Sequence, residues 1–426
     1  MVSSFRSQRL FLAFVAGLLL LASFLRLETY DRRPLWFDER ETQKLSLELE
    51  AMGPLDLARG DSFEHPTLHP LIVSWLIDSI EPIAAIRLPS VICGISSIAL
   101  LIWLGALLLD RSVGVVAGIL MTFSVYHINY SQDGRAYTLL LVLTLGQYLS
   151  LLGFWKSQRS SHLLPFPILA LCSVYTHHLG VLVQGSLVLT AIALAAVDMS
   201  RGDLEERPLV VRKMTVLAFV WVLVGLVYLP QLINTASWIG GVQRESPFTL
   251  RFSFRFFHEV LARWGGGGGW IATVYGLLFA IGATAMWRRL KVGVTLSIWL
   301  AVPFVTFALI PFRHFFDLRY VMMALPAFFL VVANGIVWLA DALASAANRR
   351  DAPFSRESVG KAALVALLAI LTASSATSYM QFRQTQQRCS EFPSRPQVLR
   401  MQDGYCAEYL LLNTLLERDR YLLEQH

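Results

Sequence analysis

Long apolar segments recur along the chain and are separated by short polar segments. A helix needs roughly 20 apolar residues to cross the hydrocarbon of a membrane, and most of these segments reach that length. The pattern predicts spans near 10–27, 86–109, 113–129, 136–155, 163–178, 180–198, 214–233, 270–287, 292–311, 318–341 and 361–380. The stretch 163–198 fits either two tilted helices or one span with a re-entrant piece. We therefore predict an all-α polytopic membrane protein, a bundle of about eleven helices.

Two polar stretches between these spans are too long to be simple turns. Residues 28–85 contain polar helix-like pieces and the half-apolar run "HPLIVSWLIDSI", which is too short to span. We expect helices lying in the membrane interface in this first outer loop, with Trp75 as an anchor. Residues 234–269 form a second outer loop and end in "RWGGGGGW", a Gly-rich linker with much conformational freedom. A plain flexible linker and a gating loop over a substrate site both fit this segment.

Composition supports a membrane protein. Of the 426 residues, 55% are hydrophobic and only 15% are charged, whereas soluble chains carry about 25% charged residues. The net charge of +6 comes from lysines and arginines that follow the predicted topology, and no nucleic-acid motif accompanies them. We therefore expect membrane lipids, and no nucleic acid, among the partners.

The distribution of lysine and arginine predicts the orientation. The first 27 residues have a basic head and an apolar core like a signal peptide, but no cleavage site follows, so they are interpreted as a retained first span. A cytoplasmic N-terminus is consistent with the basic inner connections. These connections are 110–112, 156–162, 199–213, 287–291 and 342–360. We expect a multi-pass protein of the inner or plasma membrane, with a membrane domain over 1–380 and a short outer tail over 381–426.

The four cysteines divide between the spans and the tail. Cys93 and Cys172 lie within predicted spans and are interpreted as small apolar packing residues. Cys389 and Cys406 lie in the tail, which the predicted topology puts in an oxidising compartment. We expect a disulfide between these two residues.

The segment "PLWFDERET" is the first that carries candidate chemistry. It puts Asp38 and Glu39 side by side, next to Trp36 and Phe37, where the chain leaves the first predicted span. A solvated charge cluster is one interpretation. The other is a carboxylate whose pKa is raised against an apolar boundary and which acts as a general base.

The segment "SFEHPTLHP" brings two further ligand types into the same outer loop. His65 and His69 are four residues apart, and Glu64 precedes them. With Asp38 or Glu64 they fit a divalent cation, although the prolines of this segment argue against a regular helix through both histidines. A divalent metal is therefore compatible with the sequence, and no cofactor is firmly predicted.

Three more segments bring polar residues to the outer ends of predicted spans. They are "HINYSQDGRAYTLLL", "VYTHHLG" and "PFRHFFDLRYVMMALP". An arginine that enters a span is costly without a partner, so such residues are functional candidates. The candidates are Asp133, Arg135, Tyr137, His177, His178, Arg319 and Tyr320. Because these ends share one face of the membrane, we predict a single polar site that covers the end of the bundle.

These segments carry a resemblance. "WFDE", "FEHP", "YSQDGRAYTLLL", "YTHHLG" and "LRYVMMALP" resemble, in the same order, signature segments of the GT-C glycosyltransferases related to protein O-mannosyltransferases and the aminoarabinose transferase of lipid A. The resemblance covers about residues 10 to 340. It implies a GT-C transmembrane bundle and transfer of a sugar from a polyprenyl-phosphate donor to an acceptor on the outer face.

The resemblance also implies roles for residues. Asp38 would be the general base for the acceptor hydroxyl, and Glu39 and Glu64 would orient the acceptor or tune that base. Arg135 and Arg319 would hold the lipid phosphate, for which a guanidinium is well suited. A single displacement of this kind inverts the anomeric centre. The remaining candidates are Tyr137 and Tyr320 at the donor phosphate, and His65, Asp133, His177 and His178 elsewhere in the site.

The chain departs from the family pattern at three places. Asp133 and Gly134 replace the Glu-Ala pair, and His65 stands where lysine is common, which puts a phosphate contact there in doubt. We also expect the short tail to lack the outer domain that bears on acceptor choice in some members of the family that the chain resembles. The acceptor is therefore left open among protein, lipid and polysaccharide.

Two other functions compete with the glycosyltransferase interpretation. A transporter or flippase for a lipid-linked substrate would also use outer arginines, but it would show internal repeats and polar midplane helices, and no clear repeat is found. A non-catalytic protein that binds a lipid-linked glycan is the other alternative. The presence of Asp38 and Glu39 argues against it.

Overall fold

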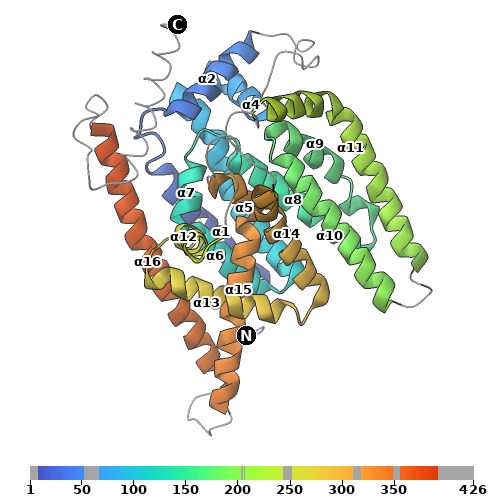
Figure 1. Ribbon diagram of the computed structural model, residues 1–426. Coiled ribbons are helices and arrows are strands. Elements are labelled where there is room, and N and C mark those ends of the chain that lie inside the picture. Colours follow the sequence, from blue (N-terminus) through green and yellow to red (C-terminus); the bar gives the residue numbers. More distant parts are fainter. Residues whose placement is uncertain are drawn as a thin grey trace.

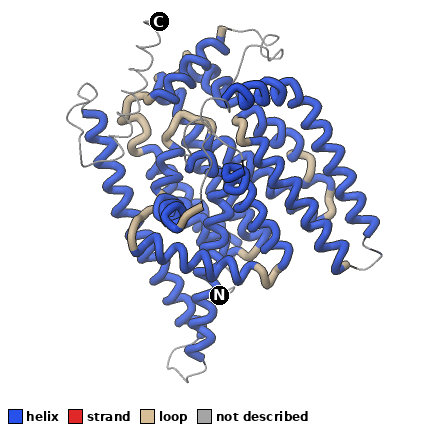
Figure 2. Tube along the Cα trace, viewed as in Figure 1, coloured by secondary structure: helices blue, strands red, loops and turns tan. Residues whose placement is uncertain are grey.

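The computed structural model describes residues 8–51, 67–202, 205, 207–242, 252–309, 318–348 and 356–391, and those residues form a helical bundle without strands (Figures 1 and 2). The first half comprises α1 (Gln8–Leu27), α2 (Phe37–Glu50), α4 (Leu68–Ile77), α5 (Pro82–Leu108), α6 (Arg111–Phe123), α7 (Val125–Ser131), α8 (Tyr137–Ser157), η1 (Ser160–His162), α9 (Phe166–Thr176) and α10 (Gly180–Arg201). The second half comprises α11 (Arg207–Val242), α12 (Phe254–Gly265), α13 (Trp270–Met286), α14 (Leu290–Leu309), η3 (Leu318–Ala324), α15 (Leu325–Asn348) and α16 (Arg356–Glu391).

The predicted membrane bundle is confirmed. In the described part of the chain, eight helices are long and apolar enough to cross a membrane, and ten spans result if each of two bent helix pairs counts as one. One predicted span, 163–178, has no counterpart among these ten. It corresponds to α9. A helix of 11 residues is only about 16 Å long, which is too short to cross the hydrocarbon.

The predicted span 113–129 is broken into α6 and α7, which meet at an angle of 67°. Ser124 has an extended backbone at the break, and its Oγ accepts the N–H of His127 to start the new helix. The fully buried guanidinium of Arg26 donates to the carbonyls of Met121 and Thr122 at the end of α6. These bonds replace the intrahelical partners that the break removes.

The central helix of the bundle is α15, whose side chains are almost all buried along its membrane-spanning part. It packs closely against α13, because Gly282 of α13 lies against the backbone of Val331 and Gly335 of α15 lies against the carbonyl of Leu278. Small residues permit such backbone contact between membrane helices. In Figure 1, α15 runs through the middle of the bundle beside α13.

Helices α2 and α4 cover one end of the bundle, called here the α2 end (Figure 1). They arise from the predicted first outer loop and confirm that it contains helices too short or too polar to span. Helix α4 is anchored by His69, a fully buried residue whose Nε2 lies 3.4 Å from Oγ of Ser90 in α5. Burial, together with the nearby Arg135, lowers the pKa of His69 to about 3, so the ring is neutral at physiological pH.

The five consecutive glycines form a defined corner between α12 and α13, which meet at 95°. Gly266 has a φ of +75°, and the N–H of Gly267 donates to the carbonyl of Ala262, which is a Schellman-type helix end. Oγ of Ser378 in α16 donates to the carbonyl of Gly266 at 2.5 Å. The left-handed backbone at Gly266 explains why glycine is needed there.

Helix α16 also binds the segment that follows α1. The carboxylate of Glu28 accepts hydrogen bonds from Oη of Tyr379 at 2.9 Å and from Nη2 of Arg383 at 2.5 Å. The helix extends to Glu391 and so includes the first part of the predicted tail. The side chain of Cys389 and the whole of Cys406 lie outside the described residues, and the expected disulfide stays a prediction.

Candidate active site at the α2 end

Asp38 lies in the first turn of α2, where the N-terminal end of a helix favours a negative charge. Its Oδ2 accepts a hydrogen bond from Nη1 of Arg319 at 2.8 Å and lies 4.0 Å from Nε of Arg135. One fifth of the Asp38 side chain is exposed. The Asp38 carboxylate therefore has two guanidinium partners and is still accessible to an incoming molecule.

Arg319 comes from η3 and lies among three aromatic rings. Its guanidinium carbon lies 5.6 Å from the ring centroid of Trp36, 6.0 Å from that of Tyr137 and 5.4 Å from that of Tyr320. At these distances the ring faces attract a cation. The rings fix the direction of the guanidinium and, together with Asp38, leave only about an eighth of the side chain exposed.

Arg135 is held by α2 itself. Its Nη1 donates to the backbone carbonyl of Asp38 at 3.0 Å and to Oγ1 of Thr42 at 3.1 Å. Almost a third of its side chain remains exposed. The guanidinium is thus fixed beside the Asp38 carboxylate and still accessible to a ligand.

Glu39 points away from this opening and is fully buried. Its carboxylate forms a two-point ion pair with Arg87 of α5, with Oε1 2.7 Å from Nε and Oε2 2.6 Å from Nη2. The backbone N–H of Gly134 also donates to Oε1 at 2.8 Å. Burial alone would raise the pKa of Glu39, but the Arg33 and Arg87 guanidiniums outweigh burial and hold it below its ordinary value. Glu39 therefore joins α2, α5 and the α7–α8 loop.

Gly134 has steric surroundings that leave no room for a larger residue. A Cβ atom at this position would collide with the side chain of Ile86 and approach the Glu39 carboxylate. Glycine lets the loop backbone come close enough to donate its N–H to that carboxylate. The same loop carries Asp133 and Arg135 on either side.

Asp133 is buried and accepts a hydrogen bond from Nε1 of Trp36 at 2.8 Å, with Nη2 of Arg33 3.9 Å away. Burial and the neighbouring Glu39 carboxylate raise the pKa of Asp133 to about 6. Asp133 thus orients the indole that lies over Arg319. Asp133 therefore acts on the site indirectly, by holding Trp36. Among the hydrogen bonds and ion pairs of the described residues, none joins Asp133 to Asp38.

The two histidines at the end of α9 lie beside the same aromatic group. The ring of His177 is 5.3 Å from that of Tyr137 and 6.3 Å from that of His178. The backbone N–H of Leu179 donates to Nδ1 of His177 at 3.1 Å. In the neutral ring this bond leaves the proton on Nε2. The structure therefore brings His177 next to Tyr137, and His178 behind it.

The remaining site predictions lie outside the described residues. Glu64 and His65 both fall in the undescribed part of the first outer loop. Within the described ranges no group of three His, Cys, Asp or Glu side chains is arranged to hold a metal ion. The interpretation of Glu64 and His65 as metal ligands, which the sequence left open, therefore stays a hypothesis.

Three residues that support the site were missed from the sequence: Arg33, Arg87 and Thr42. Arg87 had a usable signal, because an arginine at the start of a predicted span is costly unless it is paired. Thr42 and Arg33 had no such signal in the sequence, because a threonine and an arginine are common in any polar loop. Only the folded chain shows that Arg33 donates to the carbonyl of Gln132 and that Thr42 accepts from Arg135.

The ion pairs around Asp38 and Glu39 form one cluster. In this cluster four guanidiniums meet three carboxylates, which gives one more positive than negative group beside the accessible Asp38 carboxylate. The guanidiniums are Arg33, Arg87, Arg135 and Arg319, and the carboxylates are Asp38, Glu39 and Asp133. Such a site suits an anionic ligand, and a guanidinium is the preferred partner of a phosphate.

The helical bundle with a polar end covered by α2 and α4 has the GT-C fold, the fold of a class of membrane glycosyltransferases. The structure of ArnT from Cupriavidus metallidurans in the apo state is similar, with a TM-score of 0.55 at 14% identity. The same protein bound to undecaprenyl phosphate gives 0.58 at 15% identity. Both comparisons cover 89% of this chain and 76% of ArnT.

The oligosaccharyltransferase of Archaeoglobus fulgidus in the apo form is also similar, with a TM-score of 0.59 at 13% identity. This comparison covers 88% of the present chain but only 57% of that protein, so the chain spans just over half of its length. No protein-family model and no curated protein matches the sequence. The likeness is therefore one of fold.

Proposed function

We propose that this protein is a glycosyltransferase that moves a sugar from a polyprenyl-phosphate donor to an acceptor hydroxyl, with Asp38 as the general base. The observation that carries the proposal is the shared carboxylate of Asp38. It is accessible, and two guanidiniums, those of Arg319 and Arg135, lie at 2.8 and 4.0 Å from its Oδ2. A base and two phosphate-binding cations are the groups that displacement of a phosphate requires.

The proposed step is one displacement at the anomeric carbon. The acceptor oxygen forms a bond to that carbon and gives its proton to Asp38, while the bond from the carbon to the phosphate oxygen breaks. The departing polyprenyl phosphate gains a negative charge, which Arg135 and Arg319 stabilise. Attack from the face opposite the leaving group inverts the anomeric centre.

The buried residues of the site support this chemistry without contacting the substrate. Glu39 and Arg87 fix the first turn of α2, which carries Asp38. The fully buried Glu39 carboxylate has no surface for an acceptor, so we assign it to positioning the base. Tyr137, Tyr320 and Trp36 line Arg319 and would contact the phosphate or the sugar. His177 lies beside Tyr137.

The comparisons support the choice of donor. One similar structure, ArnT, holds undecaprenyl phosphate, and an archaeal oligosaccharyltransferase with a TM-score of 0.52 holds dolichol-phosphate and an inhibitory peptide. The apolar surface of the spans would accommodate a prenyl chain. The acceptor is proposed only as a hydroxyl-bearing protein, lipid or polysaccharide.

We further propose that the α2 end lies on the outer face of an inner or plasma membrane. The helix connections at the opposite end carry exposed basic residues such as Arg111, Arg159 and Arg288, as the positive-inside rule requires for a cytoplasmic face. Single cysteines at Glu48 and Arg159 would test this orientation with a membrane-impermeant maleimide. Labelling of intact cells at position 48 and not at 159 is expected, and the reverse would overturn it.

The function is tested with purified protein in lipid nanodiscs and a panel of polyprenyl-phosphate sugars, with membrane extract as the source of acceptors. Donor consumption is measured for the native chain, for Asp38→Asn and for Glu48→Gln, with and without EDTA. Glu48 is a matched control because it is an exposed carboxylate on the same helix. Turnover of one donor that is lost only in Asp38→Asn supports the proposal.

Two results would contradict it. Unchanged turnover in a folded Asp38→Asn protein would exclude Asp38 as the base. If no donor is consumed but one crosses the bilayer of proteoliposomes, the protein is a flippase. Loss of turnover in EDTA would add a metal to the site.

A further inference from the structure

We infer that Trp299, a fully buried residue of α14, is a positioning residue that sets the direction of Arg319. The inference rests on the proposed role of Arg319 at the donor phosphate. It concerns a side chain that touches neither Asp38 nor the opening of the site. The observation behind the inference is a hydrogen bond of 2.7 Å, which Nε1 of Trp299 donates to the carbonyl oxygen of Met323 in η3.

The segment that carries Arg319 has an unusual backbone. Residues Leu318–Ala324 form a 3₁₀-helix of seven residues that continues directly into the α-helix α15. Runs of 3₁₀-helix longer than three or four residues are uncommon, because their hydrogen bonds are poorly aligned. An interaction from outside the segment is therefore expected to hold this backbone, and the Trp299 indole supplies one to the Met323 carbonyl.

The backbone type decides where Arg319 points. A 3₁₀-helix turns about 120° per residue and an α-helix about 100°, so over the four residues from Arg319 to Met323 the two differ by about 80°. They also differ in rise by about 2 Å over that distance. Rewinding η3 as an α-helix would swing Arg319 away from Asp38, and the 2.8 Å bond between them would be lost.

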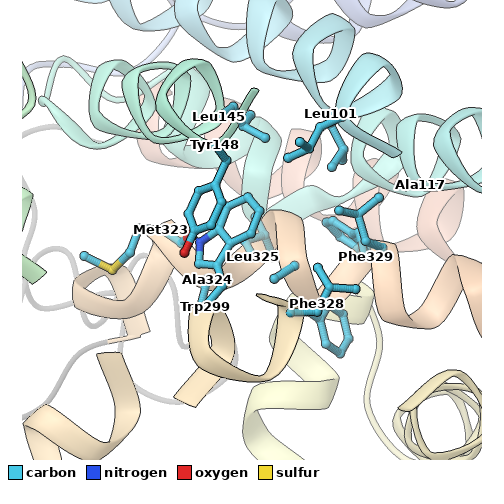
Figure 3. Close-up of a cluster of buried hydrophobic side chains, with 14 of the residues drawn as sticks. Leu101, Ala117, Leu145, Tyr148, Trp299, Met323, Ala324, Leu325, Phe328 and Phe329 are labelled. Carbon is cyan, nitrogen blue, oxygen red and sulfur yellow. The ribbon is translucent and has the colours of Figure 1, made fainter. Parts of the chain in front are cut away.

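The indole is itself held in place. Its ring stacks on that of Tyr148 in α8, with centroids 3.9 Å apart and planes 13° from parallel. Oη of Tyr148 lies 2.6 Å from Oγ of Ser186 in α10. Figure 3 shows the two stacked rings beside Met323 and Ala324, in the cluster that surrounds the start of α15. Helices α8, α10 and α14 thus fix the indole that fixes η3.

The test measures equilibrium binding of undecaprenyl phosphate to the full chain in phosphatidylcholine nanodiscs. The variants are Trp299→Phe, Arg319→Lys and the double variant. Trp155→Phe is the matched control, because Trp155 is also buried and its Nε1 donates to Asp198 at 3.0 Å, on helices α8 and α10. Both Trp→Phe changes remove an indole hydrogen bond and are expected to lower the unfolding temperature.

Of the two Trp→Phe changes, only Trp299→Phe is expected to weaken binding, by roughly threefold to tenfold, the loss typical of one hydrogen bond. Because Trp299 acts through Arg319, adding Trp299→Phe to Arg319→Lys is expected to change binding less than twofold. Independent, multiplied losses in the double variant would overturn the inference. If Trp299→Phe does not fold, replacing Trp299 with 3-benzothienylalanine keeps the shape, removes the N–H and carries the same expectation.

The failure of this inference differs from the failure of the proposed function. Weakened binding in Arg319→Lys together with native binding in Trp299→Phe overturns only the role of Trp299. Native binding in Arg319→Lys, or no binding by the native chain, overturns the phosphate-binding role of Arg319 and this inference with it.

Discussion

Nη1 of Arg319 lies 2.8 Å from Oδ2 of Asp38, although 281 residues separate them in the chain. The proposed base therefore has the proposed phosphate-binding cation as its partner. A donor phosphate would compete with Asp38 for the same guanidinium. When the phosphate takes that guanidinium, the carboxylate is released to accept a proton.

The Asp38–Arg319 pair gives the Asp38→Asn variant two effects of opposite sign. Turnover is expected to fall by about 10²–10⁴, the usual contribution of a general base. Binding of undecaprenyl phosphate is expected to hold or to strengthen, because Arg319 loses a competing carboxylate. Donor consumption and equilibrium binding in nanodiscs measure the two effects. Weaker lipid binding in a folded variant would show that Asp38 helps to bind the donor.

The buried pair of Glu39 and Arg87 is expected to support stability strongly. Glu39→Gln leaves the Arg87 charge without its carboxylate, and loss of one partner of a buried pair costs about 3–5 kcal/mol of unfolding free energy. The double variant Glu39→Gln/Arg87→Met is expected to recover part of this loss. Unfolding by SDS in mixed micelles, measured for both single variants and for the double variant, completes a double-mutant cycle. If the loss in the double variant equals the sum of the two single losses, the two residues are not coupled.

Asp133 gives a pH dependence of stability whose sign is set by its raised pKa. The native state holds the Asp133 proton up to about pH 6, whereas an unfolded aspartate, with a pKa near 3.8, loses it earlier. The contribution of Asp133 to stability is therefore present below about pH 4 and is lost as the pH rises to about 6. The unfolding temperature of Asp133→Asn, measured from pH 4.5 to 7, is expected to lack this decline. A decline equal to that of the native chain would assign it to another group.

Close packing of α13 on α15 makes Gly282 sensitive to one methyl group. Gly282→Ala would press a Cβ atom against the backbone of Val331, and overpacking of this kind costs about 1–3 kcal/mol. Gly225→Ala in α11 is the matched control, since a Cβ atom there meets nothing within 4 Å. Unfolding in SDS is expected to be easier for the first variant and unchanged or harder for the second. Equal effects would show that the backbone contact is not tight.

Hydropathy predicted the helices well because membrane spans are apolar along most of their length. The predicted span 86–109 and the observed α5, Pro82–Leu108, differ by four residues at one end and one at the other. It could not predict the break at Ser124, because that stretch contains neither proline nor a glycine pair. The break depends on Arg26, a residue almost 100 positions away that takes the freed carbonyls.

The site residues could be predicted only as a set. The segments with Asp38, Arg135 and Arg319 do meet, as expected for polar residues at the same end of a bundle. Which arginine pairs with which acid is not written in the sequence: Glu39 pairs with Arg87, 48 residues away, and is buried while its neighbour Asp38 is open. The 3₁₀ backbone of η3 is equally hidden, since its apolar pattern also suits an α-helix.

The bonds from α16 to Glu28 set the order in which the molecule can be completed. Glu28 and Tyr379 are 351 residues apart, and at about 5–20 residues per second a ribosome needs roughly 18 to 70 s to make the chain between them. During that time the segment leading to α2 is already made, but its carboxylate has no partner from α16. The end of the bundle that carries Asp38 is therefore completed only after α16 has been synthesised.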